Sequence, residues 1–353
     1  MVLIVDSQQS AVNSQQSIKS VVRRLLSVDH NKNAMKIFRI VMLMSLISLY
    51  SCGNREEDTP KVEEGFIEVP GGRVWYRIVG ADKPGIPLLT LHGGPGAPHD
   101  YLEPMESLAT DRPVIFYDQL GCGNSELPTD TSLWNVERFV EELELVRTAL
   151  KLEKVHLMGQ SWGTMLAVEY MLRRQPEGVV SLILSGPYLS TPLWVADQQQ
   201  WIAQLPETVR DTIMKYEENG DFAAPAYQEA MVAFYNKHLC RIDPWPDALN
   251  RAFEKMGMAV YVHMWGPSEF TMTGTLKQAD LTERLHEIKI PVLFTCGEYD
   301  EATPKTTAYY QSKIEDAEIC VFEGASHSHV LEKSDAYNQR VNDFLRKTDS
   351  ASD

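Results

Sequence analysis

Apolar and polar residues along this chain form two alternating patterns. Short runs rich in β-branched and aromatic residues predict strands, and several are continuously apolar, as expected for strands buried on both faces of a sheet. Between them, the apolar positions of residues 136–150 repeat at helical spacing, and a second helix is predicted over 164–174, ended by Pro176. The predicted strands cover residues 73–79, 88–92, 114–118, 155–158, 180–185, 292–296 and 318–322. This order predicts the α/β class, with a mostly parallel, doubly wound sheet covered by helices.

The alternation stops between residues 191 and 284. This interval has helical patterns, many aromatic residues and no strand pattern. Ligands of open α/β sheets bind beyond the carboxyl ends of the strands. We therefore expect a helical cap over 191–284, inserted above an α/β core that residues 66–190 and 285–348 form.

The segment before the core has the features of a secretion signal. Lys36 and Arg39 precede an apolar run over residues 40–50, which is shorter than the ~20 residues that a membrane-spanning helix needs. The sequence Leu-Tyr-Ser-Cys at 49–52 resembles a bacterial lipobox, in which the cysteine is acylated and becomes the first residue of the mature protein. A plain signal peptide or a buried strand is the alternative for this run.

These features divide the N-terminal part in two. Residues 1–51 are expected to be an extension and a lipoprotein signal peptide, with Met35 as an alternative start. Residues 52–65, mostly polar and acidic, are expected to be a tether. With a lipid on Cys52, the protein is expected in the bacterial cell envelope, on the periplasmic or outer-membrane face, and bound to the membrane only through that anchor.

The charge and the cysteines narrow the range of functions. The chain has 33 lysines and arginines against 49 aspartates and glutamates, a formal net charge of −16. Nucleic-acid binding draws its affinity from clustered basic residues, so no nucleic-acid partner is expected. The five cysteines are irregularly spaced, without a C-x-x-C pair or a Cys/His cluster. We therefore expect neither a disulfide framework nor a metal site, and no cofactor.

A candidate nucleophile lies in a G-x-S-x-G motif over residues 159–163, between a predicted strand and a predicted helix. In α/β hydrolases this motif is the nucleophile elbow, a strained turn that exposes the serine at the top of the sheet. The small residues on either side, Gly159 and Gly163, allow the strand and the helix to approach each other. This context predicts Ser161 as the nucleophile.

A serine hydroxyl needs a base, and the base needs a carboxylate to orient it. In this fold both follow the serine in sequence, in the order acid and then histidine, on turns after late strands. Asp300 follows one late predicted strand and His327 follows the next. We favour His327 over the competing His329, because His327 comes first after the glycine that ends the strand. Glu298 competes with Asp300 only weakly, because it is closer to the strand.

The reaction also needs two backbone N–H groups that stabilise an oxyanion, each worth roughly 3–4 kcal/mol. The residue after the nucleophile, Trp162, supplies the first. The second is expected from the loop His-Gly-Gly-Pro-Gly at 92–96, directly after a predicted strand. Gly93 or Gly94 would present its amide there without a blocking side chain.

With these residues established, the sequence resembles the proline iminopeptidase family of serine aminopeptidases, which includes the tricorn-interacting aminopeptidase. The likeness extends from the His-Gly-Gly-Pro-Gly loop through the elbow to the final helix. It includes three further stretches, Tyr-Asp-Gln-Leu-Gly-Cys-Gly-Asn-Ser at 117–125, Trp-Gly-Pro-Ser-Glu-Phe-Thr-Met-Thr-Gly at 265–274 and Gly-Glu-Tyr-Asp-Glu-Ala-Thr-Pro at 297–304. General α/β hydrolases lack the stretch at 265–274, which makes the resemblance specific.

The resemblance implies how a substrate is held. In that family two glutamates bind the free amino group of a peptide, and they match Glu269 and Glu301. An ammonium about 4 Å from a carboxylate gains up to ~4 kcal/mol at an effective dielectric of 20. Tyr261 matches a family residue near the same amine. The alternative is that both glutamates are solvated surface acids. Candidates for an apolar pocket around the first side chain, which could equally be packing residues, are Trp162, Trp265 and Phe270.

Taken together, these features predict a serine aminopeptidase that uses no metal or cofactor. It would release the N-terminal residue, proline or another small or hydrophobic residue, from short peptides with a free N-terminus. The rival interpretation is a carboxylester or lactone hydrolase with the same triad and no amine recognition. A lipid-anchored binding protein that has lost catalysis is disfavoured, because every element of the triad and the oxyanion hole is present.

Overall fold

The structure, a computed structural model of the chain, describes residues 60–351. The predictions for residues 1–51, for Cys52 and for the tether up to residue 59 lie outside the described residues. Within 60–351, no helix combines the length and the apolar character needed to cross a membrane.

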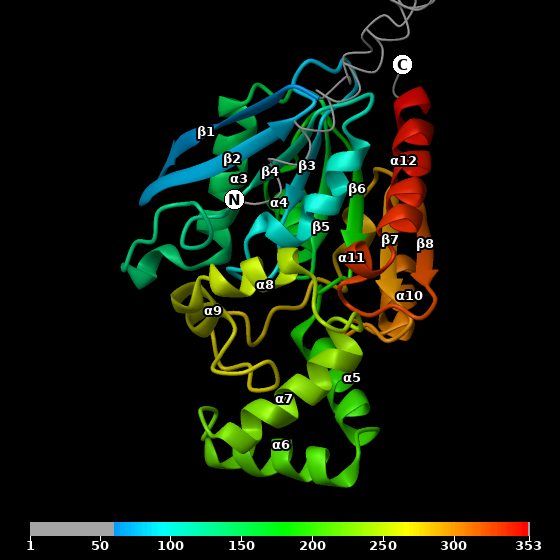
Figure 1. The fold of residues 1–353 in the computed structure, drawn as a ribbon. Coiled ribbons are helices and arrows are strands. Elements are labelled where there is room, and N and C mark those ends of the chain that lie inside the picture. Colours follow the sequence, from blue (N-terminus) through cyan, green and yellow to red (C-terminus); the bar gives the residue numbers. More distant parts are fainter. Residues whose placement is uncertain (1–59, 352–353) are drawn as a thin grey trace, which may run out of the picture. The chain divides into compact units, whose positions relative to one another are not determined.

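Eight strands form one central sheet: β1 (Val62–Val69), β2 (Gly72–Val79), β3 (Leu88–Leu91), β4 (Val114–Tyr117), β5 (Val155–Gln160), β6 (Val179–Ser185), β7 (Val292–Gly297) and β8 (Ala317–Phe322). Their order is β1-β2-β4-β3-β5-β6-β7-β8 (Figure 1). β2 pairs antiparallel with β1 and β4, and all other neighbours are parallel. β3, β4, β5 and β7 are buried along their whole length, which explains why their sequences are nearly continuous apolar runs.

The structure contains all seven predicted strands and an eighth, β1, that the sequence did not predict. The sequence assigns residues 52–65 to a tether, and this assignment is wrong from Val62 onward, where β1 begins. Only Ile67 and Val69 of β1 are buried. Because β1 is an edge strand with mostly exposed residues, it lacks the apolar run that reveals a central strand.

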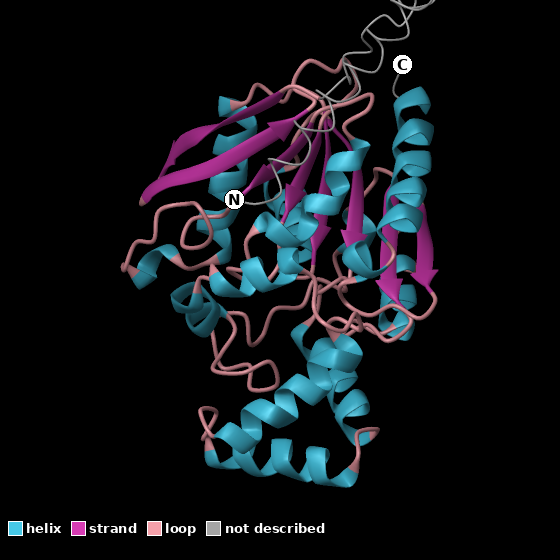
Figure 2. Cartoon of the chain, viewed as in Figure 1, coloured by secondary structure: helices cyan, strands magenta, loops and turns pink. Residues whose placement is uncertain are grey.

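Helices cover both faces of the sheet, as predicted (Figure 2). The α-helices of the core are α3 (Val136–Ala149), α4 (Trp162–Arg174), α10 (Pro304–Gln311), α11 (His329–Glu332) and α12 (Ser334–Ala351), and its 3-10 helices are η1 (His99–Leu108), η2 (Thr131–Leu133) and η3 (Leu285–Glu287). α3, α4 and α10 share one apolar core with strand residues such as Leu157 and Leu184. η1 and α12 share another with Met158 and Ile183. Neighbouring residues of a strand therefore point into two separate cores.

Residues 191–284, the interval of the predicted cap, contain five α-helices and no strand, and the structure describes this interval in full. They are α5 (Thr191–Ala203), α6 (Glu207–Asn219), α7 (Pro225–His238), α8 (Asp247–Glu254) and α9 (Met258–Met264). α5, α6 and α7 project beyond the carboxyl ends of the parallel strands (Figure 1). An apolar cluster that includes Ile213 and Phe234 holds α6 against α7.

The first described strand, β1, begins at the end of the sheet that lies away from the cap. β1 runs antiparallel to β2, and β2 runs antiparallel to β4, so β1 points in the same direction as the parallel strands. β1, which starts at Val62, therefore begins at the end of the sheet that the amino ends of the parallel strands form (Figure 1). The cap lies at the opposite end.

Candidate active site

The turn between β5 and α4 holds Ser161 in a strained backbone conformation. Ser161 has φ +52° and ψ −120°, a region that residues other than glycine rarely adopt. A Cβ at Gly159 would lie 2.3 Å from the carbonyl oxygen of Gly163, and one at Gly163 would lie 2.0 Å from that of Leu91. Both glycines are therefore required for the close approach of strand and helix. Ser161 lines the cavity beneath the cap.

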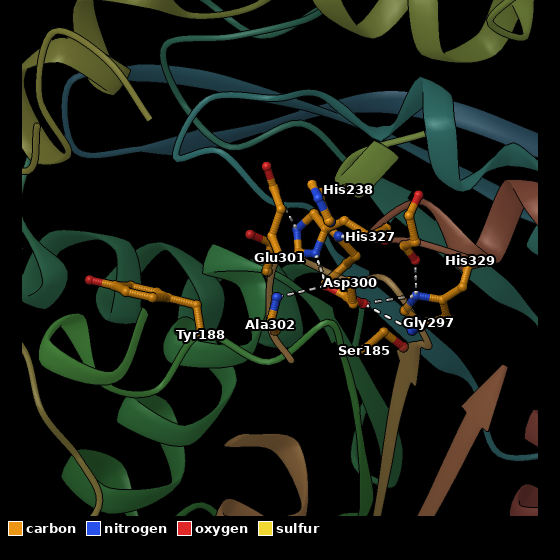
Figure 3. Close-up of polar contacts among 12 residues, drawn as sticks. Ser185, Tyr188, His238, Gly297, Asp300, Glu301, Ala302, His327 and His329 are labelled. Atoms are coloured by element: carbon orange, nitrogen blue, oxygen red, sulfur yellow. Dashed lines mark hydrogen bonds and ion pairs between the residues drawn. The ribbon is translucent and has the colours of Figure 1, made fainter. Parts of the chain in front are cut away.

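Asp300 and His327 form a buried pair on the loops after β7 and β8. His327 Nδ1 donates to Asp300 Oδ1 at 2.6 Å, which leaves Nε2 for the cavity (Figure 3). The Asp300 carboxylate also accepts the N–H of Gly297 at 3.1 Å and that of Ala302 at 2.8 Å. Burial alone would raise the pKa of Asp300, but His327 and His329 lower it well below its usual range. Asp300 thus remains ionised and fixes the imidazole.

The two competing residues lie outside the cavity. His329 is fully buried, with Nε2 2.9 Å from Thr295 Oγ1 and Nδ1 3.4 Å from Asp300 Oδ2. It therefore contacts the other oxygen of the acid, not the one that His327 binds (Figure 3). Glu298 is exposed and accepts the N–H of Gly324 at 2.9 Å. Neither residue is among those that line the cavity with Ser161.

Gly186, the residue after β6, also belongs to the site, although no pattern in the sequence predicted it. Gly186 has φ +53°, and a Cβ there would lie 2.8 Å from His327 Nδ1 and 3.4 Å from Asp300 Oδ2. Its missing side chain makes room for the acid–base pair. No sequence motif marks this glycine, because the groups that it accommodates come from distant loops.

The oxyanion candidates differ in their hydrogen bonds. The Gly93 N–H donates to the Tyr101 hydroxyl at 2.7 Å, and that hydroxyl donates to Gln160 Oε1 at 2.7 Å. Gly94 lines the cavity and has φ +105°. The amide of Trp162 is in the first turn of α4, where N–H groups have no partner within the helix. The geometry therefore favours Gly94 over Gly93 as the second donor.

Both predicted amine-binding acids face the cavity. Glu269 accepts a hydrogen bond from the Tyr261 hydroxyl at 2.9 Å. Glu301 is 2% exposed, its Oε1 has no hydrogen-bond partner, and its Oε2 lies 3.9 Å from His327 Nε2. Burial raises the pKa of both acids, and for Glu301 the neighbouring Glu269 adds to the effect. No lysine or arginine is among the described residues that line the cavity, so these acids favour a cationic ligand.

The cavity has a volume of about 340 Å³, and much of its wall is apolar. Side chains from α7, α8 and the adjoining segments form that wall, among them Met231, Tyr235, Leu249, Phe253 and Met256. The cavity therefore offers an anionic end and an apolar surface beside the nucleophile.

The three aromatic residues that were candidates for the apolar pocket do not line the cavity. Trp265 and Phe270 are not among the lining residues. The Trp265 ring lies 4.9 Å from the ring of Tyr188, and the Phe270 ring lies 4.9 Å from that of Phe234. Trp162 is fully buried in the core and contributes only its backbone. Each of these rings packs on another aromatic ring, that of Trp162 on Phe139, because aromatic side chains gain from mutual burial.

Hydrogen bonds join the cap to the loops that carry Asp300 and His327. Trp201 of α5 donates its indole N–H to the carbonyl oxygen of Asp300 at 2.8 Å. The N–H of His327 donates to the carbonyl oxygen of His238, the last residue of α7, at 2.9 Å. The cap thereby fixes the backbone on both sides of the acid–base pair.

Among the described residues, no three His, Cys, Asp or Glu side chains are grouped so as to hold a metal ion. The expectation of a reaction without metal or cofactor stays a prediction.

Comparison with known proteins places this geometry in a family. Residues 86–334 match the family model of the alpha/beta hydrolase fold. The chain is 46% identical over 283 residues to the proline iminopeptidase of Heyndrickxia coagulans, which covers 80% of this chain and 98% of that protein. It is 38% identical to the proline iminopeptidase of Saccharolobus solfataricus, over 80% of this chain and 92% of that protein.

Solved structures are also similar to this chain over most of its length. The crystal structure of the proline iminopeptidase of Mycobacterium smegmatis superposes with a TM-score of 0.78 and 37% identity, over 82% of this chain and all of that one. An N-acyl homoserine lactone degrading enzyme superposes with a TM-score of 0.60 at 19% identity, over 79% of this chain and all of that one. At that identity the likeness shows the fold alone.

The space at Gly186 generates a prediction. Gly186→Ala will greatly reduce labelling of Ser161 by a fluorophosphonate probe, because the new Cβ displaces His327. Gly220→Ala is the matched control: Gly220 also has positive φ, but nothing lies within 4 Å of its Cβ position. Equal labelling of the two variants, with both folded by circular dichroism, would contradict this role of Gly186.

The charges around His327 predict the pH dependence of Ser161 reactivity. Burial alone would lower the pKa of His327, but Asp300, and then Glu301 and Glu269, raise it to about 9. The base must be neutral to accept a proton, so the rate of fluorophosphonate labelling will rise with pH up to about pH 9. Glu301→Gln will lower the apparent pKa, because it removes the carboxylate 3.9 Å from Nε2.

The control for this measurement is Glu298→Gln, which removes an exposed acid outside the cavity. Its labelling profile should match that of the wild type. A wild-type profile with an apparent pKa near that of free histidine would contradict the prediction, as would an unchanged profile in Glu301→Gln.

Proposed function

This chain belongs to the proline iminopeptidase family of α/β hydrolases, and from that membership and the geometry of its site we propose how it acts as a serine aminopeptidase. Its substrates are short peptides with a free N-terminus. Proline is the proposed first residue, because the relatives bear the name proline iminopeptidase. One observation carries the proposal: two carboxylates, the half-buried Glu269 and the buried Glu301, face the same cavity as Ser161 and His327, and no lysine or arginine is among the described residues that line it.

In the proposed reaction, Ser161 Oγ attacks the carbonyl carbon of the first residue while His327 Nε2 takes its proton. The oxyanion that forms is stabilised by the N–H groups of Trp162 and Gly94. His327⁺, held by Asp300, then gives the proton to the leaving amine as the peptide bond breaks. Water, deprotonated by His327, hydrolyses the acyl-enzyme and restores the serine.

Amine recognition follows from electrostatics. The ammonium of the substrate replaces the repulsion between Glu269 and Glu301 with two attractive interactions in a site of low dielectric. A blocked N-terminus lacks this charge and leaves both acids uncompensated. The rival proposal, a carboxylester or lactone hydrolase, gives no such role to these acids, and the lactone-degrading neighbour shares the fold alone.

We also propose that the enzyme is a lipoprotein of the bacterial cell envelope, acylated at Cys52. The basic residues, the apolar run and the Leu-Tyr-Ser-Cys sequence support this. The position of Val62 is compatible with it, because the chain joins the sheet at the edge away from the cap.

The amine proposal predicts a selective loss in Glu269→Gln. For a proline anilide, kcat/KM should fall at least about tenfold, because one of the two charges that bind the ammonium is gone. For a short acyl ester without an amine, it should stay within about threefold. Glu298→Gln, which removes an exposed acid outside the cavity, is the matched control and should change neither. Anilide turnover within about threefold of wild type in both Glu269→Gln and Glu301→Gln would refute amine capture.

The anchor proposal predicts incorporation of labelled palmitate into the wild-type protein in a bacterial host. Cys52→Ser should abolish the label, because the acylated thiol is absent. Cys320→Ser, which changes a partly buried thiol of the core, should keep it. An intact mass that shows residue 1 still present, or an unmodified Cys52, would refute the proposal.

A further inference from the structure

A third acid, Glu217, lies in the cap near the end of α6 and binds the segment that carries Glu269. Its Oε1 accepts the hydroxyl protons of Tyr227 and of Ser268, the latter at 2.7 Å, and its Oε2 accepts that of Thr271. Tyr227 belongs to α7, and Ser268 and Thr271 flank Glu269 in the loop after α9. One carboxylate thus ties three segments of the cap together.

The hydrogen bond to Ser268 sets the conformation around Glu269. The Ser268 hydroxyl donates to Glu217, so its lone pairs are available to accept the N–H groups of Phe270 at 3.3 Å and Thr271 at 3.0 Å. These bonds close a turn of which Glu269 is a central residue. Because the turn fixes the backbone of Glu269, its side chain approaches Tyr261 from a defined direction.

A carboxylate is the group that this arrangement requires. Ionised Glu217 offers acceptors on both oxygens and so satisfies all three hydroxyl donors. A glutamine has one oxygen and one NH₂ group, so at least one of the three hydroxyls could no longer donate to this side chain. Burial is the largest factor that raises the pKa of Glu269, and the charge of Glu217 adds to it.

We propose that Glu217 is a positioning residue for amine recognition: through Ser268 and Thr271 it holds Glu269 in the orientation that captures the ammonium of the substrate. The inference rests on the proposed function, because it assigns the geometry of that site to a residue that does not itself line the cavity. It makes Glu217 a determinant of specificity for free N-termini, whereas the chemistry at Ser161 does not depend on it.

The test compares Glu217→Gln with Glu218→Gln, a neighbouring exposed acid with the same change of charge. For proline anilide, Glu217→Gln should raise KM at least about fivefold and leave kcat within about twofold, because binding is lost and the reaction step is kept. For the amine-free ester, both variants should equal the wild type. Glu218→Gln should equal the wild type on both substrates.

A second pair of variants tests the inference even if Glu217→Gln does not fold. Thr271→Val removes one of the three hydroxyl donors at nearly constant volume, and it should raise KM for the anilide. Thr271→Ser keeps the hydroxyl and should restore the wild-type KM. In the double variant Glu217→Gln/Thr271→Val, the rise in KM should be smaller than the product of the two single effects, because both remove the same bond.

The outcomes separate this inference from the proposed function. A wild-type enzyme that cleaves the anilide, together with a Glu217→Gln variant that behaves like Glu218→Gln, would overturn the positioning role alone. A parallel loss of ester turnover in Glu217→Gln would also overturn it, because the variant would then have damaged the whole site. A wild-type enzyme that cleaves the ester but not the anilide would overturn both.

Discussion

The negative charge of Asp300 is completely buried, and the site depends on keeping it ionised. An isolated carboxylate in the interior of a protein is destabilised by several kcal/mol unless donors surround it. Here two backbone N–H groups and the imidazole of His327 bond to its oxygens, and His329 lies against Oδ2. The direction of the catalytic imidazole follows from this arrangement. Its Nδ1 is committed to the acid, and only Nε2 remains for proton transfer.

The cap extends this control from the core to the substrate. α5 bonds to the carbonyl oxygens of Asp300 and Glu301 through Trp201 and Gln198, at 2.8 and 3.1 Å. The end of α7 accepts the N–H of His327. The same insertion supplies Glu269 and the apolar wall of the cavity. Binding of the amine and orientation of the triad are therefore mechanically linked, since both depend on how the cap helices sit on the loops beneath them.

Much of this could be predicted from the sequence, because central strands and the elbow leave local signals. Burial on both faces makes the inner strands continuously apolar, and the positions of Ser161, Asp300 and His327 after the parallel strands β5, β7 and β8 bring them to one end of the sheet. β1 escaped prediction because an exposed edge strand needs few apolar residues. Gly186, which was not predicted, and Trp265, which was a candidate to line the cavity and does not, show what local sequence cannot predict. A space for a ring, or the choice between packing and facing a ligand, depends on contacts between distant segments that no local pattern encodes.

Val62 lies at the edge of the sheet formed by the amino ends of the strands, whereas the nucleophile and the cap lie at the carboxyl edge. A support attached at the start of β1, whether a bilayer, a bead or a fused carrier, would therefore lie behind the catalytic face. Immobilisation through this end would restrain diffusion of the protein without requiring the cap to face the support.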